Sequence, residues 1–205
     1  MVFIMSENVP GESYSIDFIP NQIRQGVTRF AEGALKERFE RKLPRCIARW
    51  GKLYAETIKV KPFELLFRQA RFLYIDGYLE AVVALCGMTV EALCISIAED
   101  RVPAGPIKNK LTDPKNWASN KIEPLKKYFK GDYSASLLCD VLDIRRKYVH
   151  LHKTHADPND VLQCVHKLHL VLMAEYGLVP GKGGQFRSPT KEDVERGAKR
   201  MGITL

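Results

Sequence analysis

The feature that most constrains the fold is an apolar segment over residues 79–98, in which Glu80 and Glu91 are the only charged side chains. A helix that is apolar on all sides is stable in water only when other elements cover it. The segment approaches the length of a membrane span, but a carboxylate at the centre of a bilayer is costly. We therefore expect a central helix that is enclosed by other helices and has no contact with a membrane.

A second helical pattern precedes this segment and has one apolar side. Residues 63–75 place apolar side chains on one side, with Arg68 and Arg71 on the other. Asp76 and Gly77 then interrupt the pattern, and a short Asp-Gly turn between two helices predicts an antiparallel helical hairpin. Further helices are predicted from about Ser134 and over residues 159–176. Strands of convincing length are not predicted, so the expected class is all-α.

The chain of 205 residues is long enough for one domain with appendages. Residues 1–62 are expected to form an N-terminal arm followed by helices, and residues 63–176 the helical core. Residues 177–205 begin with a glycine-rich run and are predicted to be a flexible tail, in which residues 191–201 could form a last short helix.

The net charge and the cysteines indicate which class of partner and which cellular compartment to expect. The net charge of +8 favours acidic partners such as RNA or a nucleotide. The five cysteines have no CxxC spacing and mostly lie within apolar helical pattern, which is typical of buried thiols in a reducing compartment. The first five residues lack the charged region of a signal peptide. We expect a cytoplasmic protein without a cofactor.

Arg145 is the side chain in most need of a partner. A helix over residues 137–152 places it near the centre of a stripe formed by Leu137, Leu138, Val141, Leu142, Ile144, Tyr148 and Val149. Removing a guanidinium from water costs several kcal/mol, so such a group is usually paired or functional. Glu91 needs a cation for the same reason. We therefore expect Glu91 to approach Arg145 or another basic residue in a structural ion pair.

Arg145 is followed by four residues and then His150. Here the chain resembles the HEPN superfamily, whose compact α-helical domains carry an R-x4-6-H motif, and the resemblance covers roughly residues 63–176. It implies a HEPN-like helical bundle. Catalytic members are metal-independent endoribonucleases whose site is shared across a homodimer. The resemblance would make Arg145 the phosphate-binding group and His150 the acid–base group, roles that suit their chemistry.

The motif departs from the usual HEPN form at two positions. Arg146 follows Arg145 where Asn, Asp or His is commoner, and His152 stands where toxins paired with nucleotidyltransferase antitoxins carry tyrosine. Residues five apart on a helix point about 140° away from each other, whereas residues seven apart nearly eclipse. Either His150 or His152 can therefore be the partner of Arg145 in a catalytic site.

Two other patterns carry alternative interpretations. Lys126, Lys127, Arg146 and Lys147 are candidates for contacts with an RNA backbone; the lysines over residues 108–130, interleaved with Trp117, Tyr128 and Phe129, either bind nucleic acid or form a solvated face. His150, His152, His155 and Asp157 have a spacing that suggests zinc. Three ligands from one short segment seldom close around one ion, so no metal is expected.

Two functional hypotheses follow from these residues. The first is a homodimeric HEPN-like protein that binds RNA and could cleave it without a metal, with an antitoxin or another protein as a further partner. The second is a catalytically silent helical module that binds a nucleotide or a protein.

Overall fold

The computed structural model describes residues 32–33, 36–54, 57–59, 61–149, 155–181 and 185–205. Its chain divides into two compact units, residues 1–44 and 45–205. In the first unit the described residues include the π-helical turn η2 (Arg38–Lys42). Helix α2 (Leu43–Trp50) spans the boundary between the units. His150 and His152 lie outside the described residues.

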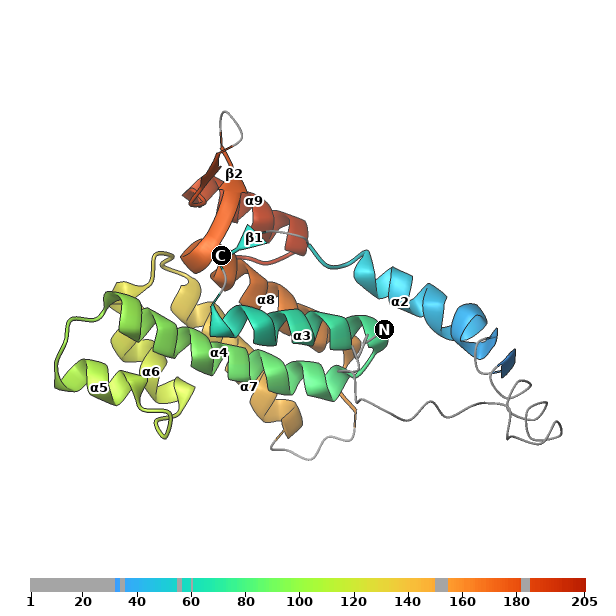
Figure 1. Cartoon of the computed structure of the whole chain (residues 1–205), viewed down its shortest axis with the longest axis horizontal. Coiled ribbons are helices and arrows are strands. Elements are labelled where there is room, and N and C mark those ends of the chain that lie inside the picture. The colour runs from blue at the N-terminus through green and yellow to red at the C-terminus, as the bar shows by residue number, and fades with distance from the viewer. Residues whose placement is uncertain (1–31, 34–35, 55–56, 60, 150–154, 182–184) are drawn as a thin grey trace, which may run out of the picture. The chain divides into compact units, whose positions relative to one another are not determined.

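The second unit is mainly helical, which confirms the predicted all-α class. Its helices are α3 (Pro62–Asp76), α4 (Leu79–Arg101), α5 (Pro106–Thr112), α6 (Ala118–Leu125), the 3₁₀ turn η3 (Lys126–Tyr128), α7 (Ser134–Val149), α8 (Pro158–Tyr176) and α9 (Lys191–Met201) (Figure 1). Helix α4 contacts α3, α5, α6, α7 and α8. It is therefore the central helix of this unit.

The predicted helical hairpin is present as α3 and α4 (Figure 1). Gly77 follows α3 with a φ of 89°, and its N–H donates to the carbonyls of Leu73 and Tyr74. This left-handed conformation suits glycine and ends the helix. Among the described helices, α4 alone is long and apolar enough to cross a membrane by length and composition, and 61% of its most apolar stretch is buried inside the protein. The prediction of a core helix is confirmed.

The segment after α8 forms a small sheet, which the sequence did not predict. Strand β2 (Gly177–Pro180) pairs antiparallel with β1 (Thr57–Ile58) on one side and with β3 (Phe186–Arg187) on the other. The strands are only two to four residues long, so alternation of apolar side chains is too short to reveal them. The sheet ties the chain after α8 to the segment before α3.

Helix α9 corrects the prediction of a flexible tail over residues 177–205. Thr190 and Asp193 form a capping box at its start. Val194, Ala198 and Met201 recur at helical spacing and are each less than 5% exposed, and α9 contacts α8. Helix α9 is therefore packed on the core through its apolar face, whereas the residues around β3 are exposed. The prediction of a helix over residues 191–201 is confirmed.

The cysteines are free, and three of them lie in the core. Cys86, Cys94 and Cys164 are buried, whereas Cys46 is half-buried and Cys139 exposed. Burial raises the pKa of Cys94 to about 12. A thiol with so high a pKa stays protonated near neutral pH and acts as a small apolar side chain.

His166 gives the fold a testable dependence on pH. This α8 residue is 5% exposed, and its Nε2 lies 2.8 Å from the carbonyl oxygen of Lys52. Burial lowers the pKa of His166 below its ordinary value of 6.5. As the pH falls through 6.5, His166 is therefore protonated in the unfolded chain but stays neutral in the folded chain. The free energy of unfolding then falls by up to about 1.4 kcal/mol per pH unit.

We expect the free energy of unfolding, measured with urea, to fall between pH 7 and pH 5. The loss should be smaller in His166→Gln, because this variant has no imidazole to protonate. The exposed His155 supplies the matched control, and His155→Gln should keep the wild-type loss. An identical loss in His166→Gln would show that other groups cause the acid sensitivity.

Candidate functional site

A cavity of about 140 Å³ lies where α4, α6 and α7 meet, and we call it the Arg145 cavity. Its lining consists of Glu91, Trp117, Ala118, Ser119, Leu142, Arg145 and Arg146. Pockets for drug-sized ligands usually measure about 300–1,000 Å³. The Arg145 cavity therefore has room for one ring system or one phosphate group, with the rest of a larger ligand outside.

Arg145 reaches the cavity from the middle of the buried face of α7. Leu138 and Val141 on that face are fully buried, and the Arg145 side chain is 20% exposed. Its Nη1 donates to Oε1 of Glu91 at 3.2 Å, so the approach of Glu91 to Arg145 that the sequence predicts is present. Within the described residues, Nε of Arg145 is buried without a hydrogen-bond partner. Such an N–H costs roughly 1–3 kcal/mol until an acceptor reaches it.

Gly87 provides the space in which Arg145 lies. It stands one helical turn before Glu91 on α4, and a Cβ at this position would lie 2.2 Å from Cδ and 2.7 Å from Nε of Arg145. The arginine side chain thus crosses directly over the α4 backbone. Glycine within a helix costs roughly 0.5–1 kcal/mol relative to alanine, so its presence here has a steric reason. Gly87 was not among the predicted site residues, although a glycine four residues before the lone carboxylate in the middle of an apolar helix is a usable signal.

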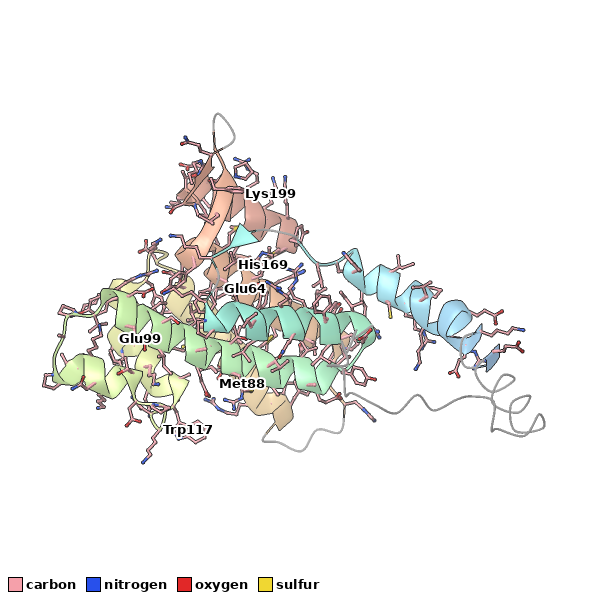
Figure 2. All side chains as sticks on the ribbon, in the orientation of Figure 1. Glu64, Met88, Glu99, Trp117, His169 and Lys199 are labelled. Carbon is pink, nitrogen blue, oxygen red and sulfur yellow. The ribbon has the colours of Figure 1, made fainter. Side chains whose placement is uncertain are left out.

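The start of α6 forms another wall of the cavity. Trp117 occupies the N-cap position, where it makes no side-chain capping bond, and it is 63% exposed (Figure 2). Ala118 and Ser119 form the first turn. The N–H groups at a helix N-terminus favour anions, and an exposed indole is a surface for base stacking. The cavity therefore combines an aromatic face with groups that attract phosphate.

Of the other basic residues that the sequence proposed, Arg146 lies at the cavity. Its side chain is 62% exposed and forms a 2.9 Å ion pair with Asp143. An exposed pair of this kind is worth little, so a ligand can displace it. Lys147 instead donates to Asp160 of α8, which also accepts a 2.5 Å bond from the Tyr148 hydroxyl.

Lys126 and Lys127 do not line the cavity. Both are exposed in η3, beyond the far end of α6 from Trp117. The helical rise of about 1.5 Å per residue puts Lys126 roughly 10 Å along the axis from Ser119. These lysines can contact only a ligand that extends well beyond the cavity.

The described residues include only part of the histidine motif and of the zinc pattern. His150 and His152 lie outside the described residues, so their pairing with Arg145 stays a prediction. Asp157 of the zinc pattern accepts a bond from the N–H of Asn159 at 2.7 Å and caps α8. The described part of the chain holds no group of three metal-ligating side chains.

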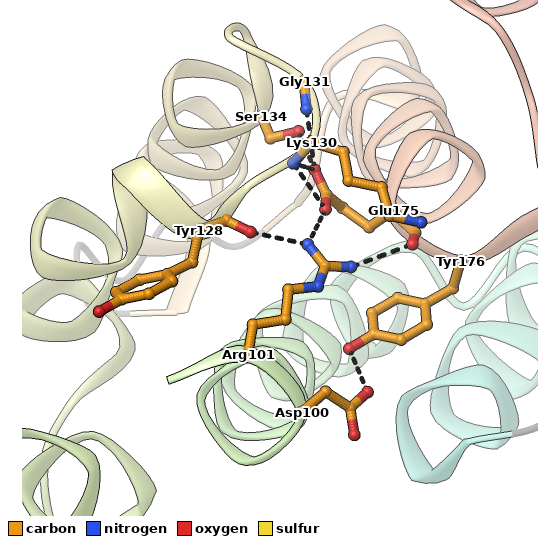
Figure 3. A network of polar contacts seen from close by, with 8 residues as sticks. All are labelled: Asp100, Arg101, Tyr128, Lys130, Gly131, Ser134, Glu175 and Tyr176. Atoms are coloured by element: carbon orange, nitrogen blue, oxygen red, sulfur yellow. Dashed lines mark hydrogen bonds and ion pairs between the residues drawn. The ribbon is translucent and has the colours of Figure 1, made fainter. Parts of the chain in front are cut away.

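A second polar cluster surrounds Glu175 near the C-terminal end of α8 (Figure 3). Glu175 is completely buried and accepts bonds from Arg101 at 2.5 Å, the Lys130 N–H at 3.0 Å and the Ser134 hydroxyl at 2.7 Å. Arg101 also donates to the carbonyl of Tyr128 at 2.8 Å. The cluster joins the end of α4, the loop before α7 and the end of α8.

This second cluster is structural and not a binding site. Its carboxylate is inaccessible to a ligand, and its donors come from the chain itself. By tying the start of α7 to α4 and α8, it sets the direction in which α7 carries Arg145. The local sequence around Glu175 does not predict this role, because its partners lie 41 to 74 residues away in the chain.

Comparisons of the chain with models of known protein families, with curated proteins and with solved structures found no match. The resemblance to the HEPN superfamily therefore rests on the residues of the motif and their place in the helical order.

Proposed function

We propose that this chain is a HEPN-like RNA-binding protein in which the Arg145 cavity and its rim together bind a phosphate and the adjoining base. The observation that carries the proposal is the placement of Arg145 beside Arg146 and the exposed Trp117 around one cavity. Two guanidinium groups, a helix N-terminus and an indole are the elements that bind a nucleotide by charge and stacking. The net charge of +8 supports an anionic ligand.

The fuller proposal is that the protein cleaves this RNA without a metal. Arg145 would stabilise the charge that develops on the phosphate, while His150 or His152 would move protons at the ribose 2′-hydroxyl or the leaving oxygen. The resemblance implies that two copies of the chain complete the site. In this arrangement a neutralising antitoxin would be a natural protein partner.

A catalytically silent nucleotide-binding module is the second candidate. The observation that favours it is that Glu91 and Asp143 already pair with the two arginines of the cavity. In such a module the two ion pairs would hold the arginines in place for reversible binding of a nucleotide. Arg145 would then have no catalytic role. Binding and cleavage must therefore be measured separately.

Binding is tested by the fluorescence of Trp117. The chain has two tryptophans, so Trp50→Phe leaves Trp117 as the sole reporter. Single-stranded RNA should quench this signal, and Arg145→Ala should weaken binding roughly 10- to 100-fold, because a bond to a charged group is worth about 1.5–3 kcal/mol. The control is Arg68→Ala, which removes an equally charged, exposed arginine of α3. Equal weakening by both variants would point to a non-specific effect of charge.

Cleavage is tested by incubating the same RNA with the protein in the presence of a chelator. Loss of acid–base catalysis should slow cleavage by about 10²–10⁴-fold in His150→Ala, and Arg145→Ala should also be strongly impaired. Bound RNA that remains intact with the wild-type protein would instead support the silent module. Sedimentation of the wild-type protein tests the expected homodimer.

A further inference from the structure

We infer that the Arg145 cavity selects guanine among the four RNA bases. The inference rests on the proposed function, because it names the base that occupies the proposed RNA site. Its starting point is Glu91, a carboxylate in the wall of a cavity that otherwise attracts anions. Besides its ion pair with Arg145, this partly exposed carboxylate can accept further bonds from donors on a base, whereas it repels a phosphate.

The groups around the cavity match guanine on both edges and on its face. The N1–H and N2–H₂ donors of guanine lie side by side and suit the two oxygens of the Glu91 carboxylate. Its O6 and N7 acceptors suit the fork of an arginine, which Arg145 or Arg146 can supply. Trp117 offers the surface on which the base can stack. The volume of about 140 Å³ has room for one base, so the ribose and the phosphate of the nucleotide would lie at the rim of the cavity.

The other bases do not offer this combination. Adenine presents an N1 lone pair to the carboxylate and an amino group where the arginine needs an acceptor. Uracil and cytosine have no N7 and cannot place two adjacent donors opposite a carboxylate. Guanine alone pairs two neighbouring donors with two neighbouring acceptors.

The structure holds Glu91 in a state suited to this role. Its contact with Arg145 uses Oε1, and the side chain is 34% exposed at the cavity. The ion pair holds the Glu91 side chain in position, so that its orientation is set before a base arrives. A base that donates to the carboxylate then replaces water and leaves the ion pair in place.

The experiment measures binding of guanosine, inosine and adenosine 5′-monophosphates by Trp117 fluorescence in the Trp50→Phe protein. Guanosine should bind roughly 10- to 100-fold more tightly than adenosine. Inosine should fall between them, because it keeps N1–H, O6 and N7 but lacks the N2 amino group. This comparison uses three ligands on one protein and does not depend on the folding of a variant.

Glu91→Gln should bring the affinity for guanosine down to that for adenosine. Glu99→Gln, which changes an exposed glutamate of the same helix outside the cavity, should keep the preference. Equal affinity for guanosine and adenosine in the wild-type protein, or a preference that survives Glu91→Gln, would overturn the inference. RNA binding that depends on Arg145 but not on base identity would leave the proposed function standing; no RNA binding at all would remove both.

Discussion

Replacement of Glu175 by alanine is expected to lower the free energy of unfolding by about 3–5 kcal/mol, as removal of one partner of a buried ion pair typically does. Glu175 is fully buried and accepts bonds from Arg101, Ser134 and two backbone N–H groups. Its loss leaves a partly buried guanidinium without a counter-charge and several donors without an acceptor. Because the free energy of unfolding of native proteins is only about 5–15 kcal/mol, this change should leave the folded state only marginally stable.

The measurement is the midpoint of urea unfolding followed by circular dichroism. Glu99→Ala is the matched control, since it removes an exposed glutamate from the end of α4 and should change stability by less than about 0.5 kcal/mol. A double variant, Arg101→Leu with Glu175→Leu, should recover part of the loss, because apolar side chains replace both charges. A loss below about 1 kcal/mol in Glu175→Ala would contradict the structural role of this cluster.

Replacement of Gly87 by alanine should abolish most RNA binding, although Gly87 offers a ligand no side chain. The new methyl group would occupy the position of the Arg145 side chain, whose Cδ lies 2.2 Å from the site of the Cβ. Arg145 must then leave its place against α4. We expect RNA affinity to fall roughly 10- to 100-fold, the value of a charged hydrogen bond. Stability should change little, because the helical preference of alanine offsets part of the displacement.

Fluorescence titration with RNA and urea unfolding of the same variant separate these two effects. Gly51→Ala is the control, because a Cβ there meets its nearest neighbours at an ordinary 3.6 Å. If Gly87→Ala bound RNA with wild-type affinity, the position of Arg145 over α4 would have no part in binding.

The helical order could be read from the sequence wherever burial follows a local pattern. Residues 79–98 have no polar side, so they had to become a covered helix, and Asp76 with Gly77 placed the turn of the hairpin. The sheet could not be read in this way. Its β1–β2 pairing joins Ile58 to Gly177, more than a hundred residues apart, through strands too short to show alternation.

The candidate site divides along the same line. Glu91 and Arg145 could be predicted as partners because each is a charged side chain among apolar helical residues. Burying an unpaired charge is costly, and the neighbouring residues in the sequence already show that each position faces the core. Trp117 was named only as one aromatic among many lysines, and its place beside Arg145 depends on how α6 packs against α4 and α7.

The sequence by itself therefore determined that this protein is helical, that α4 is covered and that Arg145 is a charge on an apolar face that is either paired or functional. These properties follow from the helical period and from the hydration energy of single side chains, which need no knowledge of distant residues. Only the tertiary structure decided that Gly87 and Trp117 lie beside Arg145, and that Glu175 fixes the start of α7. The reason is that those contacts join segments far apart in the chain, and their geometry is set by the packing of whole helices.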